Sequence, residues 1–442
     1  MEPVTHFLTG ACIGRAGLNR KTAYATLAAV LAAEAADIDV LWGWAGPVEG
    51  LKHHRGITHT FLAVPVVAAA AVGIVWLFDR WWERRRRRRL AASQSNEPGS
   101  LLCTDTGEFP GKTPEKHPSE AKAHGVFTRF MYGLKPVPFN QTSASLTQTT
   151  VLFNQTSASD SAKKLTRSTQ QVRWGWLYLT ALVSALSHLL LDWTNNYGLR
   201  PFFPFNPRWY EGSFVFIAEP VIWALLVTAL VIPWLLGLVG GEIGVRRTTF
   251  RGRGWAIFAL TGIVLLWGWR WSEQGRARAL AENTQIAAAP VKRMALEPYP
   301  INPYHWHAIL ETAEYYQTAE INTLSGEIES DPRLDLLYKP PPTAATEAAK
   351  RTLLGEVYMD WGSWAVVRDV GPEPIPGPVP GLKPPQLPLN RTWTAVEFYD
   401  LRFDYPFLGA GRTSDRHHLS GWVYIVDGRD EAGEAMNGRE QR

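Results

Sequence analysis

Long apolar segments constrain this chain more than any other feature of its sequence. A helix needs roughly 20 apolar residues to cross the hydrocarbon core of a membrane. Four segments approach or reach that length: residues 61–78, 174–193, 220–239 and 255–271. Tryptophan stands within or near the ends of these segments, as it does at the lipid–water boundary of membrane proteins. The pattern predicts a mainly α-helical membrane protein with a multi-helix transmembrane bundle.

The first forty residues are apolar but less continuous. Residues 4–17 and residues 22–40 form two segments rich in alanine and glycine, with three basic residues near their junction: Arg15, Arg20 and Lys21. Small side chains let two helices approach closely. We expect a tightly packed hairpin of half-buried or membrane-inserted helices.

Six consecutive arginines at positions 84–89 indicate how the chain is oriented. Cytoplasmic loops carry an excess of Lys and Arg, so this run predicts that the preceding span ends in the cytoplasm. Further basic residues mark the inner end of the third span: Arg246, Arg247, Arg251 and Arg253. The expected result is a multi-pass protein of the bacterial inner membrane, with residues after about 272 on the outer face.

The sequence divides into four parts. We expect the hairpin, a His-rich loop and the first long span at 1–83, and a basic, disordered cytoplasmic loop at 84–173. Three further spans occupy 174–271. A β-rich outer domain follows at 272–442, because residues 306–321, 357–367 and 393–405 mix β-branched and aromatic side chains. A helix remains the alternative for 306–321, and Pro- and Gly-rich residues 371–388 predict a linker.

Charge and cysteine content exclude several classes of function. The formal net charge is +4, and without the arginine run the remainder is −2, so no distributed basic face for nucleic acid is expected. Two cysteines, Cys12 and Cys103, are too few for a disulfide framework or a thiolate zinc site. Any metal ion that the protein binds must therefore be held by histidine and carboxylate groups.

Histidine and acidic residues gather at one membrane face in the predicted topology, although they come from separate segments. They are His6, Asp37, Asp39, His53, His54, His59, His188, Asp192 and Glu219. Ionisable residues are costly in lipid and usually mark function there. Any one of them alone has a simpler explanation, such as a polar anchor at the membrane surface or a helix end. Their convergence favours a metal site.

The spacing of these residues suits chelation. His188 and Asp192 are four apart on a helix and project from the same face. Asp37 and Asp39 cannot both point the same way within a helix, so one is expected to ligate while the other orients a histidine. His54 and His59 flank Gly56, whose conformational freedom permits both imidazoles to face one centre.

Several motifs together resemble a known family. They are THFLTG at 5–10, AADIDVL at 35–41, HHRGITHT at 53–60, SHLLLDWTNNYGLRPFFPF at 187–205 and the Glu-Pro step at 219–220. This set is similar to the predicted membrane-bound metal-dependent hydrolases related to YdjM, over roughly the first 240 residues. The resemblance implies that His6, Asp37, Asp39, His54, His59, His188 and Asp192 form the metal site. The family usually has proline where Ala36 stands, a departure that concerns helix termination more than ligation.

Two functions from different classes follow. The first is a hydrolase with one or two divalent ions, zinc above all but also manganese or iron. It would act on a lipid or lipid-linked phosphoester at the outer face, with Asp39, Arg55 and Glu219 as catalytic residues and Arg200 as a second candidate for holding an anionic head group. The second is a metal-binding transporter or structural protein without hydrolysis, in which Glu34 would serve an ion path.

Overall fold

The computed structural model describes residues 2–95, 171–242, 252–331, 333–375, 382–408 and 417–441. Most of the predicted disordered loop lies outside these residues, as do Arg246, Arg247 and Arg251. Residues 1–80 and 170–442 form one compact unit, and residues 81–169 form another. The predicted hairpin, the three later predicted spans and the C-terminal region therefore belong to a single unit, whereas the helix that contains the first predicted span continues from it into the other unit.

The predicted N-terminal hairpin is formed by α1 (Pro3–Arg15) and α2 (Ala25–Glu34). The two helices approach so closely that a Cβ atom at Gly14 would lie 2.5 Å from the Cα atom of Thr26. A Cβ atom at Gly10 would lie 2.9 Å from the carbonyl oxygen of Ala29. The absence of a side chain at both glycines is what permits this packing.

The second helix of the hairpin is shorter than predicted. It ends at Glu34, and the chain continues as a 3-10 segment, η2 (Ala35–Trp44). A short helix, α3 (Pro47–His53), and the 3-10 turn η3 (Ile57–His59) follow. The backbone N–H groups of Val48 and Glu49 at the start of α3 donate to the side-chain oxygen of Gln441, whose amide nitrogen donates to the carbonyl of Ala45. A residue far along the chain thus caps α3.

Four long helices follow: α4 (Val64–Ser95), α6 (Trp174–Thr194), α7 (Pro220–Glu242) and α8 (Arg253–Asn283). Three stretches in the described chain are long and apolar enough to cross a membrane: Val64–Arg89, Trp174–Thr194 and Pro220–Leu238. The fourth predicted span, at 255–271, is helical as part of α8 but does not belong to this set. The helix α8 also continues past residue 271, the expected end of the membrane region.

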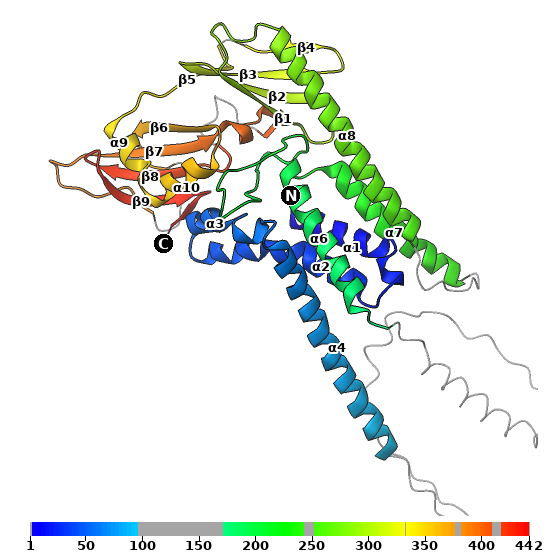
Figure 1. The fold of residues 1–442 in the computed structure, drawn as a ribbon. Helices are drawn as coiled ribbons and strands as arrows, with labels where there is room; N and C mark the ends of the chain where they lie inside the picture. The colour runs from blue at the N-terminus through cyan, green and yellow to red at the C-terminus, as the bar shows by residue number, and fades with distance from the viewer. Residues whose placement is uncertain are drawn as a thin grey trace, which may run out of the picture. The chain divides into compact units, whose positions relative to one another are not determined.

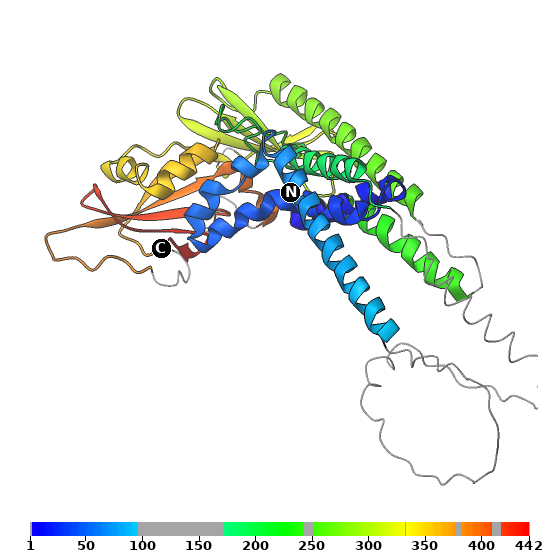
Figure 2. The same ribbon diagram turned by 60° about the horizontal axis from the view of Figure 1, so that its bottom comes forward.

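The C-terminal region contains two antiparallel sheets of five strands each, which Figures 1 and 2 show as a yellow-green and an orange-red group. The first sheet comprises β1 (Arg293–Pro298), β2 (His305–Glu311), β3 (Tyr315–Asn322), β4 (Glu327–Glu329) and β5 (Leu336–Tyr338). The second has the order β10 (Arg439–Glu440), β9 (Asp430–Met436), β8 (Gly421–Val426), β7 (Trp393–Asp400) and β6 (Ala365–Gly371). Two short helices, α9 (Ala344–Ala349) and α10 (Leu353–Trp361), connect them in sequence.

These sheets confirm the predicted β-rich region and decide its details. Residues 306–321 form β2 and β3, so the helical alternative was wrong. The expected strand at 357–367 was also wrong in its first half, because those residues complete α10 before β6 begins. The apolar face of α10 buries Leu354 and Tyr358 against the second sheet, which outweighs the β preference of isolated aromatic residues.

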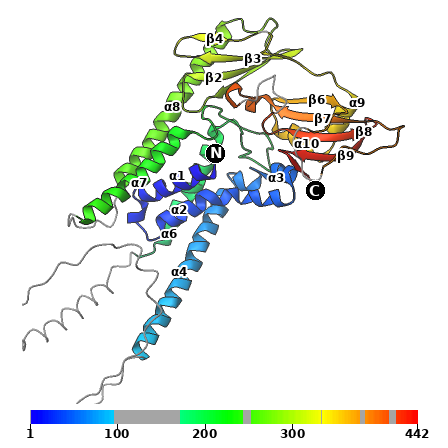
Figure 3. The ribbon, with the colours of Figure 1, turned by 180° about the vertical axis from the view of Figure 1, so that it is seen from behind.

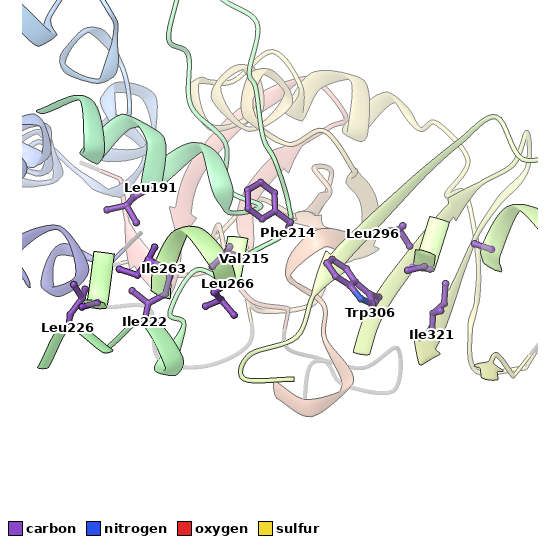
Figure 4. Packing of buried hydrophobic residues seen from close by; sticks show 14 of the residues in the cluster. Leu191, Phe214, Val215, Ile222, Leu226, Ile263, Leu266, Leu296, Trp306 and Ile321 are labelled. Atoms are coloured by element: carbon purple, nitrogen blue, oxygen red, sulfur yellow. The ribbon is translucent and has the colours of Figure 1, made fainter. Parts of the chain in front are cut away.

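Buried apolar side chains join the long helices to the first sheet and the short helix α3 to the second. Leu191 of α6, Ile222 of α7 and Ile263 of α8 belong to one cluster with Trp306 and Ile321 of the first sheet (Figure 4). A second cluster contains Val48 and Leu51 of α3 together with side chains of α10 and the second sheet. Seen from behind in Figure 3, α3 lies next to the second sheet. The segment that carries the histidine-rich motif is therefore anchored to the C-terminal region.

A buried Glu–His group in the first sheet offers a test by pH. Glu320 of β3 accepts hydrogen bonds from His307, at 2.7 Å, and lies 3.1 Å from His305. Burial raises the pKa of Glu320, but hydrogen bonds from His305 and His307 outweigh it and lower the pKa to about 2. A depressed carboxyl pKa contributes stability above the unfolded value, near 4.5, and loses it as pH falls towards the folded value.

We therefore expect Glu320→Gln to melt at a lower temperature than the natural protein at pH 6, and the difference to shrink between pH 4.5 and pH 2.5. Thermal unfolding at a series of pH values measures this. A difference independent of pH would contradict the assignment. Glu327→Gln, at an exposed position of β4, is the matched control and should change little at any pH.

Candidate metal centre

Six predicted residues from four elements meet in the interior. We call them the His–Asp cluster: His6 of α1, Asp37 and Asp39 of η2, His59 of η3, and His188 and Asp192 of α6. All three imidazoles are fully buried, as are Asp192 and Asp39, whereas the side chain of Asp37 is 19% exposed. Asp37 is therefore the one member of the His–Asp cluster whose side chain is partly exposed.

Four atoms of the cluster lie around a common centre. The Nε2 atoms of His59 and His188 are 3.0 Å apart, and Asp192 Oδ2 lies 3.4 Å and 3.3 Å from them. Asp37 Oδ1 lies 3.3 Å from His59 Nε2 and 3.6 Å from His188 Nε2. A tetrahedral ion with ligand bonds of about 2.0–2.1 Å places its ligand atoms roughly 3.3 Å apart. The geometry fits a divalent metal.

Neighbouring groups turn both imidazoles so that their Nε2 atoms face this centre. The Nδ1 atom of His188 lies 2.6 Å from the carbonyl oxygen of Ala33, which only accepts, so Nδ1 carries the proton. The Nδ1 atom of His59 lies 3.2 Å from Asp39 Oδ2 and 3.1 Å from the Thr58 hydroxyl. Carboxylates and carbonyls hold metal-binding histidines in this way in many proteins. The two Nε2 atoms then face each other, an arrangement that a shared proton or a bound metal ion satisfies.

The charge of the cluster points to the same requirement. Among the described residues, the carboxylates of Asp37, Asp39 and Asp192 lie close to one guanidinium, that of Arg55. Gathered carboxylates in a buried site need positive charge nearby, because unpaired buried charge is strongly unfavourable. The pKa of His59 is raised, because the adjacent Asp37 and Asp39 outweigh the effect of its burial. A proton on His59 or a bound cation would each supply positive charge there.

Arg55 connects two of the carboxylates rather than facing a substrate. Its backbone N–H donates to Asp39 Oδ2 at 2.8 Å, and its guanidinium donates to Asp192 Oδ1 at 2.7 Å. The guanidinium also donates to Asn195 and to the carbonyl of Gly198. Arg55 is only 2% exposed and adopts a positive φ of 52°. The structure thus places Arg55 where it orients Asp192 so that the other carboxylate oxygen faces the histidines.

His6 and His54 lie at the two sides of the centre. His6 stacks on His188 with ring centroids 3.8 Å apart, and its Nε2 atom is 3.4 Å from Asp192 Oδ1. His6, Asp37 and His188 form a second possible ligand group that overlaps the first. His54, by contrast, is 33% exposed, and its Nδ1 atom lies 3.3 Å from Asp39 Oδ1. The cluster therefore has a buried side at His6 and an open side at His54.

Three further predicted residues lie elsewhere. His53 is 37% exposed, pairs with Glu49 at 3.2 Å and stacks on Trp42, so it is placed outside the ligand set. Arg200 is held by Asp360 at 3.1 Å and by the carbonyl of Lys52.

Glu219 lies against α8 rather than in the His–Asp cluster. Its Oε2 atom accepts from Arg270 of α8 at 2.7 Å, while Oε1 accepts from the backbone of Ile301. Both Glu219 and Arg270 are buried. This carboxylate joins α7 and α8 to the loop between β1 and β2.

Sequence reasoning missed the groups that orient the ligands. Thr58 donates to Asp39 Oδ2, and Asn195 accepts from Arg55. Both are adjacent to recognised motifs: Thr58 precedes His59, and Asn195 follows Asp192 by three residues. The sequence signal that could have identified Thr58 and Asn195 is therefore their position next to predicted metal ligands. The carbonyl of Ala33 could not have been found, since any residue supplies a carbonyl.

Comparisons with known proteins give one match. The model of a family described as YdjM inner membrane protein matches residues 1–277. The matched residues contain the whole His–Asp cluster and end within α8, before β1. No curated protein and no solved structure is significantly similar to the chain.

Proposed function

Since the chain belongs to the YdjM inner membrane protein family, we propose that it is a membrane-bound, metal-dependent hydrolase. His59, His188, Asp37 and Asp192 hold the ion, zinc or alternatively manganese or iron. The observation that carries the proposal is that Asp37 and Asp192 each place a carboxylate oxygen 3.3–3.6 Å from both histidine Nε2 atoms, which are themselves 3.0 Å apart. A divalent ion bound there activates water and polarises a phosphoryl oxygen.

The residues at the open side provide for proton transfer. His54 is partly exposed and is held by Asp39, whose second oxygen accepts from the Arg55 backbone. The hydrogen bonds from His54 and His59 lower the pKa of Asp39 despite its burial, so this carboxylate stays ionised and holds the imidazole. We assign the movement of a proton at the substrate to His54, with Asp39 as the group that positions it.

Exposed apolar side chains next to the cluster support a lipid or lipid-linked phosphoester as the substrate. Ile38, between the two acidic residues of η2, is 59% exposed, and Trp44 at the end of η2 is 88% exposed. Ile57 and Phe61, two residues before and two residues after His59, are also exposed, and the ring of Phe61 contacts Phe202. Large exposed apolar surfaces mark contacts with membranes or partners. We place them in the outer leaflet, in agreement with the cytoplasmic side expected for the arginine run.

A second candidate is a metal carrier without hydrolysis, which one observation favours. Glu34 lies one helical turn before Asp37, and its Oε1 atom is buried without a hydrogen bond among the described residues. A carboxylate in this position continues the polar path beyond the cluster. The two candidates differ in what is consumed: a hydrolase cleaves a phosphoester, and a carrier does not.

The test is metal-dependent cleavage of a panel of lipid phosphates by the purified full-length protein in detergent. We expect cleavage that stops after chelation and returns with added zinc or manganese. Glu34→Gln should retain it, because the chemistry is confined to the open side. If the metal-loaded protein cleaves no member of the panel, hydrolysis of lipid phosphates is wrong. Loss of ion flux in Glu34→Gln without any cleavage would establish the carrier instead.

A further inference from the structure

A second possible binding site lies at the other end of α1 and α6. A cavity of about 610 Å³ is lined by residues of α1, the turn after it, α6 and α8. This volume is within the range of small-ligand sites. Ten residues of α1 separate Ala16 of the cavity from His6, and twelve residues of α6 separate Trp176 from His188. At 1.5 Å per residue these separations are about 15 Å and about 18 Å, so the cavity is distinct from the His–Asp cluster.

Three cations line this cavity: Arg20, Lys21 and Arg253. No aspartate or glutamate is among the lining residues, and none of the three cations forms an ion pair with the parts of the chain that the structure describes. Like charges gathered without a counter-ion repel one another. All three side chains are exposed, so the cavity offers a positive surface that attracts an anion.

Two of the cations are held in place by neighbouring groups. The Nε atom of Arg253 donates to the carbonyl of Ala16 at 3.1 Å, where the C-terminal end of α1 attracts a cation. Gly17 has a φ of +148°, and a Cβ atom there would lie 3.3 Å from Arg253 Nε. Lys21 lies over the ring of Trp176, 5.5 Å from its centroid. These contacts leave the terminal nitrogens of Arg253 available for an anion.

The remaining lining is apolar. Ile13, Val183 and Leu260 contribute side chains, and Val183 is 42% exposed on a helix that is long and apolar enough to cross a membrane. A small soluble anion makes no favourable contact with this apolar lining. A phospholipid does, because its acyl chains lie next to its phosphate. Basic pockets between membrane helices bind anionic head groups on the cytoplasmic side. The cavity lies at the C-terminal end of α1, remote from the His–Asp cluster, and this is the end of the helix that the predicted topology places on the cytoplasmic side.

We propose that this cavity binds an anionic phospholipid, with its phosphate at Arg20, Lys21 and Arg253 and an acyl chain along Val183 and Leu260. The bound lipid joins α1, α6 and α8 at the membrane end remote from the His–Asp cluster. The inference does not depend on hydrolysis, because none of these residues contacts the cluster.

The test compares phosphatidylglycerol with phosphatidylcholine as ligands of the full-length protein in detergent, by native mass spectrometry and thermal shift. The natural protein should bind phosphatidylglycerol at least about tenfold more tightly. The triple variant Arg20→Gln, Lys21→Gln, Arg253→Gln should lose most of this preference. The control removes the same charge from the exposed end of α4, as Arg84→Gln, Arg86→Gln, Arg88→Gln, and should keep the preference.

Three outcomes would overturn the proposal. Equal loss in both triple variants would show only general attraction to the cations of the chain. An unchanged preference in the cavity variant would place the lipid elsewhere. A thermal shift with inorganic phosphate or glycerol 3-phosphate as large as that with phosphatidylglycerol would identify a soluble anion site. Circular dichroism of each variant establishes that it is folded before binding is compared.

Discussion

The variant His188→Ala is expected to bind zinc at least about tenfold more weakly than the natural protein. His188 provides one of the four converging atoms, and its Nδ1 proton is fixed by the carbonyl of Ala33. Loss of a group that merely orients a ligand costs 10–100-fold in metal affinity, so loss of the ligand itself costs at least as much. Metal content after purification and competition with a zinc-binding dye measure the effect.

His53→Ala is the matched control, since His53 is a histidine of the same motif that lies outside the cluster, paired with Glu49. It should bind zinc as the natural protein does. His59→Gln provides an independent second ligand variant, and zinc should raise the melting temperature of the natural protein but not of either ligand variant. Natural stoichiometry and affinity in both His188→Ala and His59→Gln would refute the metal site.

Replacing Arg402 by methionine should destabilise the C-terminal region by about 3–5 kcal/mol. Arg402 is 1% exposed and donates to both oxygens of Asp400, at 3.0 Å and 2.9 Å, and to Glu211. It also donates to the carbonyl of Asn196 at 2.9 Å. Methionine fills a similar volume but leaves the buried Asp400 and the half-buried Glu211 without their cation. Thermal or chemical unfolding, followed by tryptophan fluorescence, measures the loss.

Arg391→Met tests whether burial is the cause. Arg391 also pairs with two carboxylates, Asp427 and Asp430, but on the surface, where ion pairs are screened by water and contribute little. We expect its melting temperature to stay close to that of the natural protein. Equal effects of the two substitutions would contradict the assigned role of the buried network.

Helices and strands with a strong repeating pattern could be predicted from the sequence. The ends of elements that are set by tertiary packing could not. The three apolar stretches at α4, α6 and α7 follow from length and composition alone, since no soluble fold requires them. Alternation at 396–403 likewise indicated β7, although the strand ends at Asp400 and Leu401 to Phe403 form a 3-10 turn. By contrast, nothing in residues 35–44 signals that α2 ends at Glu34. The conformation after Glu34 places Asp37 and Asp39 in contact with histidines that lie farther along the chain. Local propensity does not contain such contacts.

Prediction of the site followed the same division. The spacing of His188 and Asp192 within one helix was sufficient to place them together. His53 and His54 are adjacent in the sequence, and only the direction of α3 decides that the first faces Trp42 and the second faces Asp39. Arg55 was predicted to be catalytic because a cation next to a metal motif resembles a substrate-binding group. Its partner Asp192 lies 137 residues away, beyond the reach of motif reasoning.

The cap of α3 has a consequence for synthesis of the protein. Gln441 accepts from the backbone of Val48, 393 residues earlier in the chain. At 5–20 residues per second, a ribosome needs about 20–80 s to bridge that interval. During this time the start of α3 lacks its partner, and Val48 and Leu51 lack the second sheet against which they pack. The segment from Asp37 to His59 is thus synthesised long before the residues that hold α3 in place. A ribosome that stalls before residue 441 leaves α3 without its contact to Gln441.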